Sequence, residues 1–179
     1  MKKSVWIFGL IMGTLLCVNL LYVMRLFYSG EDFESNDFAG YTVQVVIFSL
    51  IFFGVRNYRN KDLGGAISFG KAFKAGALVA VVGCTLYVVV WLFYYYMFAP
   101  DFLDRYIPHA LKETSRSGGD VETMQAQLES LREMYRNPLM IVVITYLEVL
   151  PVALIVALAS ALLLRKKPAG ESHGQSAAR

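Results

Sequence analysis

The sequence predicts an all-α fold, a four-span transmembrane helical bundle with a short extracytoplasmic helical segment between spans 3 and 4. Apolar residues make up 56% of the 179 residues, against about 45–50% in a soluble domain. They gather into four long runs that are apolar on all sides, as lipid-embedded helices are. The links between the runs are too short for a second globular core, so we expect one domain over residues 1–165.

Each run is long enough for a helix to cross the hydrocarbon core, which takes about 20 residues. The predicted spans cover about residues 4–28, 38–55, 72–98 and 139–164. The first run follows Lys2 and Lys3, as in a signal peptide. Its apolar stretch exceeds the roughly 7–15 residues of such a segment, and no small-x-small cleavage site follows it. We therefore expect it to be retained as a span.

The basic residues predict the orientation of the bundle. They form three clusters, before span 1, around the link between spans 2 and 3, and after span 4. Their members are Lys2, Lys3, Arg56, Arg59, Lys61, Lys71, Lys74, Arg165, Lys166 and Lys167. An even number of spans puts all three clusters on one side, whereas the link at residues 29–37 carries acids and no base. The positive-inside rule then predicts that both termini are cytoplasmic.

The link at residues 99–138 predicts a helical segment outside the membrane. Ser117, Gly118 and Gly119 form a break, and Asp120 is a good N-cap for a helix over residues 121–136. Apolar residues recur at helical spacing in this helix, and its narrow apolar stripe favours capping of the bundle over membrane-surface or partner binding. The polar tail, residues 166–179, is predicted to be a disordered cytoplasmic segment.

The most expensive polar residue is Glu148, which interrupts the fourth apolar run. An ionised carboxylate there costs about 2.5–3.5 kcal/mol on insertion scales. At a rise of about 1.5 Å per residue, three further polar residues fall in the same outer half of the membrane. We predict a polar cluster inside the bundle formed by Asn19, Arg25, Gln44 and Glu148. Hydrogen bonding between helices is the favoured interpretation, and a site for an ion, a proton or a polar substrate is the alternative.

Two further patterns concern helix packing. Pro151, shortly after Glu148, predicts a kink in the fourth span. Small residues recur at every fourth position in three spans, which lets helix backbones approach closely. They are Gly9 and Gly13, then Ala72, Gly76 and Ala80, then Ala153, Ala157 and Ala161. Packing within the bundle is the simpler interpretation, and homodimerisation through one stripe is the alternative.

No catalytic motif accompanies these features. The sequence has no H-E-x-x-H, no P-loop, no dinucleotide fingerprint and no pair of acids spaced for a metal. Ser68 and Lys71 match S-x-x-K, but the companion K-T-G is absent, and Ser68 is better explained as a helix cap. No basic face carries interleaved aromatic residues, as a nucleic-acid interface would. We expect no enzymatic activity, cofactor, metal or nucleic-acid partner.

The most distinctive stretch is residues 65–76, GAISFGKAFKAG, and the outer link begins with FAPDF at residues 98–102. With its four spans, the chain resembles the bacterial membrane family catalogued as domain of unknown function 4199, over roughly residues 1–165. The resemblance implies a small four-span protein of the bacterial inner membrane and assigns no reaction or ligand.

These observations lead to two hypotheses about function. We expect a non-enzymatic accessory or assembly component of the membrane, whose partners are the lipid bilayer and either a second copy or another membrane protein. The alternative is a small transporter or proton-coupled subunit that uses Glu148 and Arg25 as an intramembrane pair.

Overall fold

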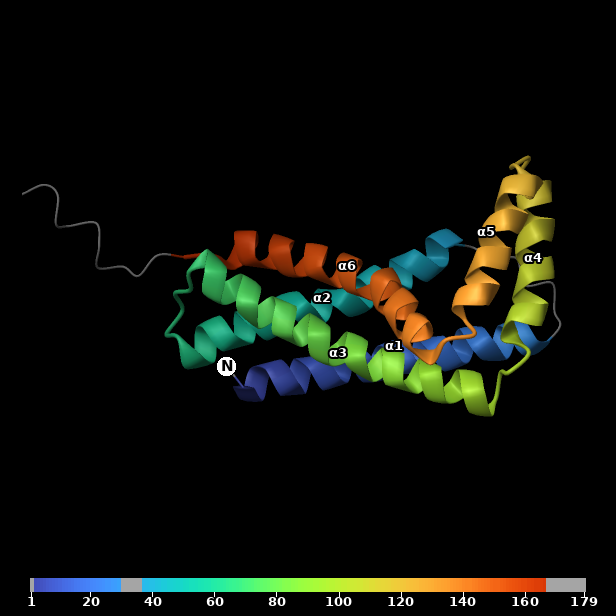
Figure 1. Ribbon diagram of the computed structural model, residues 1–179. Coiled ribbons are helices and arrows are strands. Elements are labelled where there is room, and N and C mark those ends of the chain that lie inside the picture. Colours follow the sequence, from blue (N-terminus) through green and yellow to red (C-terminus); the bar gives the residue numbers. More distant parts are fainter. Residues whose placement is uncertain (1, 30–36, 167–179) are drawn as a thin grey trace, which may run out of the picture. The chain divides into compact units, whose positions relative to one another are not determined.

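The computed structural model describes residues 2–29 and 37–166, which form six helices and no named strand (Figure 1). The predicted all-α fold is therefore confirmed for this part of the chain. The predicted disordered tail lies almost wholly outside the described residues. The helices are α1 (Lys2–Ser29), α2 (Asp37–Asp62), α3 (Phe69–Met97), α4 (Phe102–Arg116), α5 (Val121–Met134) and α6 (Pro138–Leu164).

Three helices are long and apolar enough to cross a membrane, not four. Within the described residues they are α1, α3 and α6. A helix does form where the second span was predicted, since α2 has 26 residues. The predicted second span, about residues 38–55, however, begins at residues 38–41, whose side chains lie outside the described part of the chain. The predicted count of four spans is therefore not confirmed, and whether α2 spans the membrane stays a prediction.

The turn between α2 and α3 follows from two glycines. Gly64 and Gly65 have φ angles of 62° and 92°, a left-handed conformation that glycine adopts without the steric cost of a Cβ. Ser68 then precedes α3, and its carbonyl oxygen accepts the first helical hydrogen bond from the Ala72 N–H at 2.9 Å. The position of Ser68 is that of the predicted N-cap.

The chain divides into two compact units. Unit 1 comprises residues 1–87 and 148–179, and unit 2 comprises residues 88–147. In unit 1, α1 and α2 pack with the first part of α3 and the last part of α6. The largest fully buried side chains of unit 1 are Met12, Phe48, Ile51, Val55, Val79, Cys84 and Val149.

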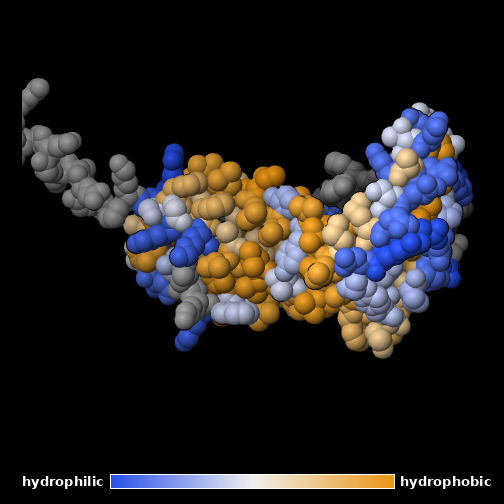
Figure 2. Space-filling view, in the orientation of Figure 1, coloured by the Kyte–Doolittle hydropathy of each residue, from blue (hydrophilic) through white to orange (hydrophobic). Residues whose placement is uncertain are grey.

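The surface of unit 1 is also apolar. Large side chains such as Ile7, Val18 and Val46 are exposed, and Figure 2 shows apolar residues over much of the visible face of these helices. A soluble protein rarely exposes apolar patches larger than a few hundred Å². Apolar residues both inside and outside the bundle are what a lipid solvent favours, so these helices have the character of a membrane protein.

Unit 2 contains the hairpin of α4 and α5. Ser117, Gly118 and Gly119 form the turn, with Gly118 at φ 73°. The Asp120 side chain accepts hydrogen bonds from the Glu122 and Thr123 backbone N–H groups at 3.0 and 3.2 Å. The predicted break, N-cap and helix after it are therefore confirmed, although α5 ends at Met134 rather than at residue 136.

Aromatic rings supply apolar contacts within unit 2. The rings of Trp91 and Phe102 meet edge to face at 5.1 Å, and those of Tyr95 and Tyr135 at 5.5 Å. Because Trp91 and Tyr95 belong to the end of α3, these contacts attach the α4–α5 hairpin to the helix that precedes it.

Candidate functional site

The four residues of the predicted polar cluster all lie in unit 1. Asn19 and Arg25 are on α1, Gln44 is on α2 and Glu148 is on α6. The amide side chains of Asn19 and Gln44 are half-buried, whereas Arg25 and Glu148 are exposed. Among the described residues, no hydrogen bond or ion pair joins any two of the four. The shared site therefore stays a prediction.

Glu148 does not lie inside the bundle, because α6 turns a different face inward. Ala153, Ala157 and Ala161 are all 0% exposed, and Val149 extends this buried stripe by one step of four residues. Glu148 instead begins the exposed stripe of the helix. That stripe comprises Glu148, Pro151, Ile155, Leu158 and Leu162, at helical spacing.

The exposed stripe surrounds the carboxyl group with apolar neighbours. Ile155 on this stripe is 65% exposed, and Leu147, which directly precedes Glu148 in the sequence, is 67% exposed. The helix continues through Pro151, which lies on the same stripe, and the kink predicted there stays a prediction. The result is a single carboxyl group on an otherwise apolar outer face, where no described residue of the chain forms a hydrogen bond or ion pair with it.

Close packing between helices confirms the simpler interpretation of the small residues. A Cβ atom added to Gly9 would lie 2.7 Å from the Val82 Cβ, and one added to Gly13 would lie 2.9 Å from the Gly83 carbonyl oxygen. Helices α1 and α3 therefore approach each other as closely as their backbones allow. Gly76 brings α3 against α6 in the same way, since its added Cβ would lie 3.1 Å from that of Ala157.

The small-residue stripes thus face inward and are used within the bundle. This use makes them unavailable as a surface for homodimerisation. Sequence reasoning missed Gly83, which faces Gly13 across the α1–α3 contact. The signal that could have found it is an isolated glycine within a helical pattern, which often marks a close backbone approach.

At one end of unit 1, long-range hydrogen bonds join segments that carry the basic clusters. Ile67 and Lys166 form an isolated antiparallel bridge, with N–H to carbonyl distances of 3.1 and 2.9 Å. The Arg59 guanidinium donates to the Leu164 carbonyl at 3.3 Å. The Asn57 amide donates to the Ser4 hydroxyl at 3.4 Å. The start of α1, the α2–α3 link and the end of α6 therefore lie at the same end of the unit (Figure 1).

The α4–α5 hairpin offers polar groups of a different kind. Arg132 on α5 forms an ion pair with Asp104 on α4, and both side chains are exposed. The hydrogen bond from the Thr123 hydroxyl, followed by those from backbone N–H groups, holds the pKa of the Asp120 carboxyl below its ordinary value. Within the described ranges, no group of three or more potential metal ligands comes together.

Comparison with known proteins adds a family relationship. The model of a family described as "Protein of unknown function (DUF4199)" matches residues 7–166. The matched range includes every helix from α2 to α6 and all but the first five residues of α1. No curated protein and no solved structure matches the chain.

Proposed function

The chain belongs to the family described as "Protein of unknown function (DUF4199)", and from this premise we propose that it is an integral protein of the bacterial inner membrane. Its role is that of a non-enzymatic accessory or assembly component, which binds another membrane protein or a second copy through α6. The apolar outer surface of unit 1 supports the membrane location, and the exposed carboxyl group of Glu148 supports the assembly role.

In the proposed topology α2 is a fourth span and both termini are cytoplasmic. Ser4, near the start of α1, bonds Asn57, near the end of α2. Helix α2 therefore runs back along α1, and its 26 residues extend about 39 Å at 1.5 Å per residue. Four spans place all the basic clusters on one side of the bilayer, where the positive-inside rule assigns them to the cytoplasm.

One observation carries the assembly role: Glu148 lies on the exposed stripe of α6. A carboxylate facing lipid is costly, and a neutral carboxyl group in hydrocarbon still requires hydrogen-bond partners for its O–H and its carbonyl oxygen. The described part of the chain supplies no hydrogen bond or ion pair to Glu148. A polar or basic side chain on the helix of a partner protein would supply the missing interaction, so the stripe is suited to a contact between chains.

Comparison of two variants tests this role. The chain is purified from its native membrane in mild detergent as wild type, as Glu148→Leu and as Ile155→Leu. The last is the matched control, because it changes the same stripe without removing a polar group. We expect a stable membrane-protein partner to be retained by wild type and Ile155→Leu and lost by Glu148→Leu. Identical complexes for all three would exclude an assembly role for Glu148.

The alternative function gives a different result. If Glu148 acts in transport, proteoliposomes containing only this chain will take up protons or a solute, and Glu148→Leu will abolish that flux. The topology has its own test. A fluorescent or phosphatase reporter fused after the C-terminus should report the cytoplasm, and a reporter active in the periplasm would contradict the four-span arrangement.

A further inference from the structure

The end of unit 1 that contains the basic clusters is held together by backbone contacts. The bridge between Ile67 and Lys166 attaches the end of α6 to the link between α2 and α3. Arg59 strengthens this attachment by donating to the Leu164 carbonyl, while its Nε donates to the Asn60 side chain at 3.0 Å. Residues about 100 positions apart in the sequence are thus held at one surface.

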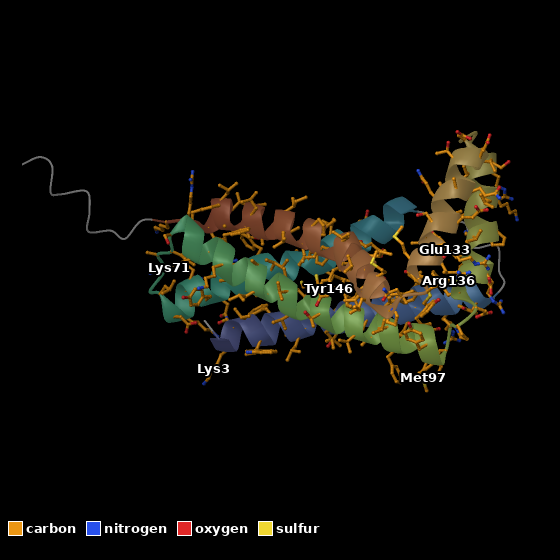
Figure 3. All side chains as sticks on the ribbon, viewed as in Figure 1. Lys3, Lys71, Met97, Glu133, Arg136 and Tyr146 are labelled. Atoms are coloured by element: carbon orange, nitrogen blue, oxygen red, sulfur yellow. The ribbon has the colours of Figure 1, made fainter. Side chains whose placement is uncertain are left out.

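This surface is strongly positive. Its exposed basic side chains are Lys3, Arg56, Lys61, Lys71, Lys74, Arg165 and Lys166. Asp62 is the only acidic residue within the ranges 4–29 and 38–74, and none occurs from Val149 to Lys166. Lys3 and Lys71, which come from different helices, both lie at this end of the unit (Figure 3).

The positive surface adjoins the apolar belt of the helices. Trp6, three residues after Lys3, is 57% exposed, and Phe69 is exposed at the start of α3 and stacks on Phe73. Exposed aromatic rings next to basic residues are typical of headgroup depth in a bilayer. Figure 2 shows the same transition, with hydrophilic residues at this end directly next to apolar ones.

We propose that this surface, which we call the basic end, binds the headgroups of anionic diacyl phospholipids such as phosphatidylglycerol. Lysine and arginine side chains from three helices surround one region, where several can contact one phosphate group or neighbouring phosphates. The adjoining apolar belt accommodates the acyl chains. An acidic soluble protein or a nucleic acid would leave that belt unused, so the combination of charge and apolar surface favours lipid.

Native mass spectrometry of the full chain, released from detergent micelles, tests the proposal. The protein is titrated with dioleoyl phosphatidylglycerol or with dioleoyl phosphatidylcholine, which has the same acyl chains and no net charge. We expect bound phosphatidylglycerol to exceed phosphatidylcholine, and we expect salt at about 0.5 M to reduce this preference because the charges are exposed. Equal binding of the two lipids at low salt would overturn the proposal.

Variants then locate the site. The triple variant Lys61→Gln, Lys71→Gln and Lys74→Gln should bind phosphatidylglycerol on the order of a hundredfold more weakly, at about 1 kcal/mol for each lysine near the surface. The matched control, Lys112→Gln with Arg116→Gln, removes exposed cations from α4 in unit 2 and should bind as wild type does. A triple variant that keeps wild-type affinity would overturn the assignment to the basic end.

Two further measurements keep the result interpretable. Replacing the same three lysines by arginine preserves the charge and should preserve binding, whereas a fall equal to that of the glutamine variant would show that positive charge does not control binding and would overturn the proposal. Soluble glycerol 3-phosphate at millimolar concentration should not displace the lipid. Displacement would show that the surface recognises a free phosphate group rather than a membrane lipid, and would contradict the proposal.

Discussion

The helices of unit 1 and the α4–α5 hairpin of unit 2 are held together by different kinds of contact. In unit 1, glycine and alanine bring helices into near backbone contact, as at Gly9 and Gly76. Large apolar side chains cover the outside. In the hairpin, an ion pair joins the two helices and Asp120 caps α5. Its outer surface is polar, and its buried residues include Leu103 and Leu128.

The difference follows from the solvent that each part is suited to. Lipid tails are as apolar as leucine, so burying leucine gives little advantage in a membrane and close packing of backbones becomes the main source of attraction. In water, burial of apolar side chains and capping of helix ends stabilise a short amphipathic hairpin. A single chain thus follows two sets of packing rules, and each rule can be tested separately.

The largest expected effect is at Ile67, which is 2% exposed and packs with Val55, Ala72 and Leu164. Ile67→Ala should lower the free energy of unfolding by about 2–5 kcal/mol, because it leaves a cavity in a packed site. Ile7→Ala removes the same atoms from a side chain that is exposed on α1, and should have little effect. Titration with SDS from mild detergent measures both, and equal losses would contradict lipid exposure of Ile7.

The next effect tests the close approach of α1 and α3. Gly9→Ala should cost about 1–3 kcal/mol, since its new Cβ meets the rigid Val82 Cβ rather than the tip of a flexible side chain. Gly70→Ala is the control, because nothing lies within 4 Å of its added Cβ and alanine is the better helix former. The same titration should show Gly70→Ala as stable as wild type or up to about 1 kcal/mol more stable.

A smaller and more local effect is expected at Asp120. Its carboxylate accepts hydrogen bonds in the folded state, which lowers its pKa. The stabilisation is therefore complete above the ordinary pKa of the group and is lost as the pH falls through the lowered folded value. Amide exchange in the first turn of α5 should accelerate, relative to the intrinsic rate, as the cap is protonated.

Two variants of Asp120 separate capping from charge. Asp120→Ala should give fast exchange at every pH. Asp120→Asn should retain the cap and lose its pH dependence, since asparagine is a good N-cap that does not titrate in this range. Identical pH profiles for wild type and Asp120→Asn would show that another group controls the stability of this turn.

The helical elements could be predicted because a helix in lipid and a helix in water each have a recognisable sequence pattern. Each of the four apolar runs became a helix, as expected where backbone groups must bond internally. The hairpin helix was predicted from the break at Ser117, Gly118 and Gly119 followed by Asp120. The number of spans is confirmed only in part: among the described residues α1, α3 and α6 are long and apolar enough to cross a membrane, and the span predicted at α2 stays a prediction.

Glu148 was predicted to face the inside of the bundle, but it lies on the exposed face of α6, although the sequence contained a signal for that direction. An all-round apolar helix has no stripe of polar residues to mark its exposed face. Its small residues, Ala153, Ala157 and Ala161, mark the buried face instead. Counting back by four from Ala153 reaches Val149, so Glu148 falls outside that face. The bridge between Ile67 and Lys166 had no such signal, because backbone hydrogen bonds between distant segments do not depend on side-chain type.

The smallest expected effect concerns the ion pair between Asp104 and Arg132. Both side chains are more than half exposed, and exposed pairs of this kind are worth about 0–1 kcal/mol. A double-mutant cycle with Asp104→Asn and Arg132→Gln, read from amide exchange in α4 and α5, should give a coupling in that range. The cycle for Glu133 and Arg136, a pair local to the end of α5, should give less, since it joins no two helices.

A large coupling energy between Asp104 and Arg132 would contradict the conclusion that the hairpin is packed for water and unit 1 for lipid. Water screens an exposed pair, whereas an environment of low dielectric constant strengthens it several-fold. A value above about 2 kcal/mol would exceed the range for exposed pairs and would mean that Asp104 and Arg132 are shielded from water. The hairpin would then be stabilised as part of a covered interface, and its polar surface would indicate a partner rather than solvent.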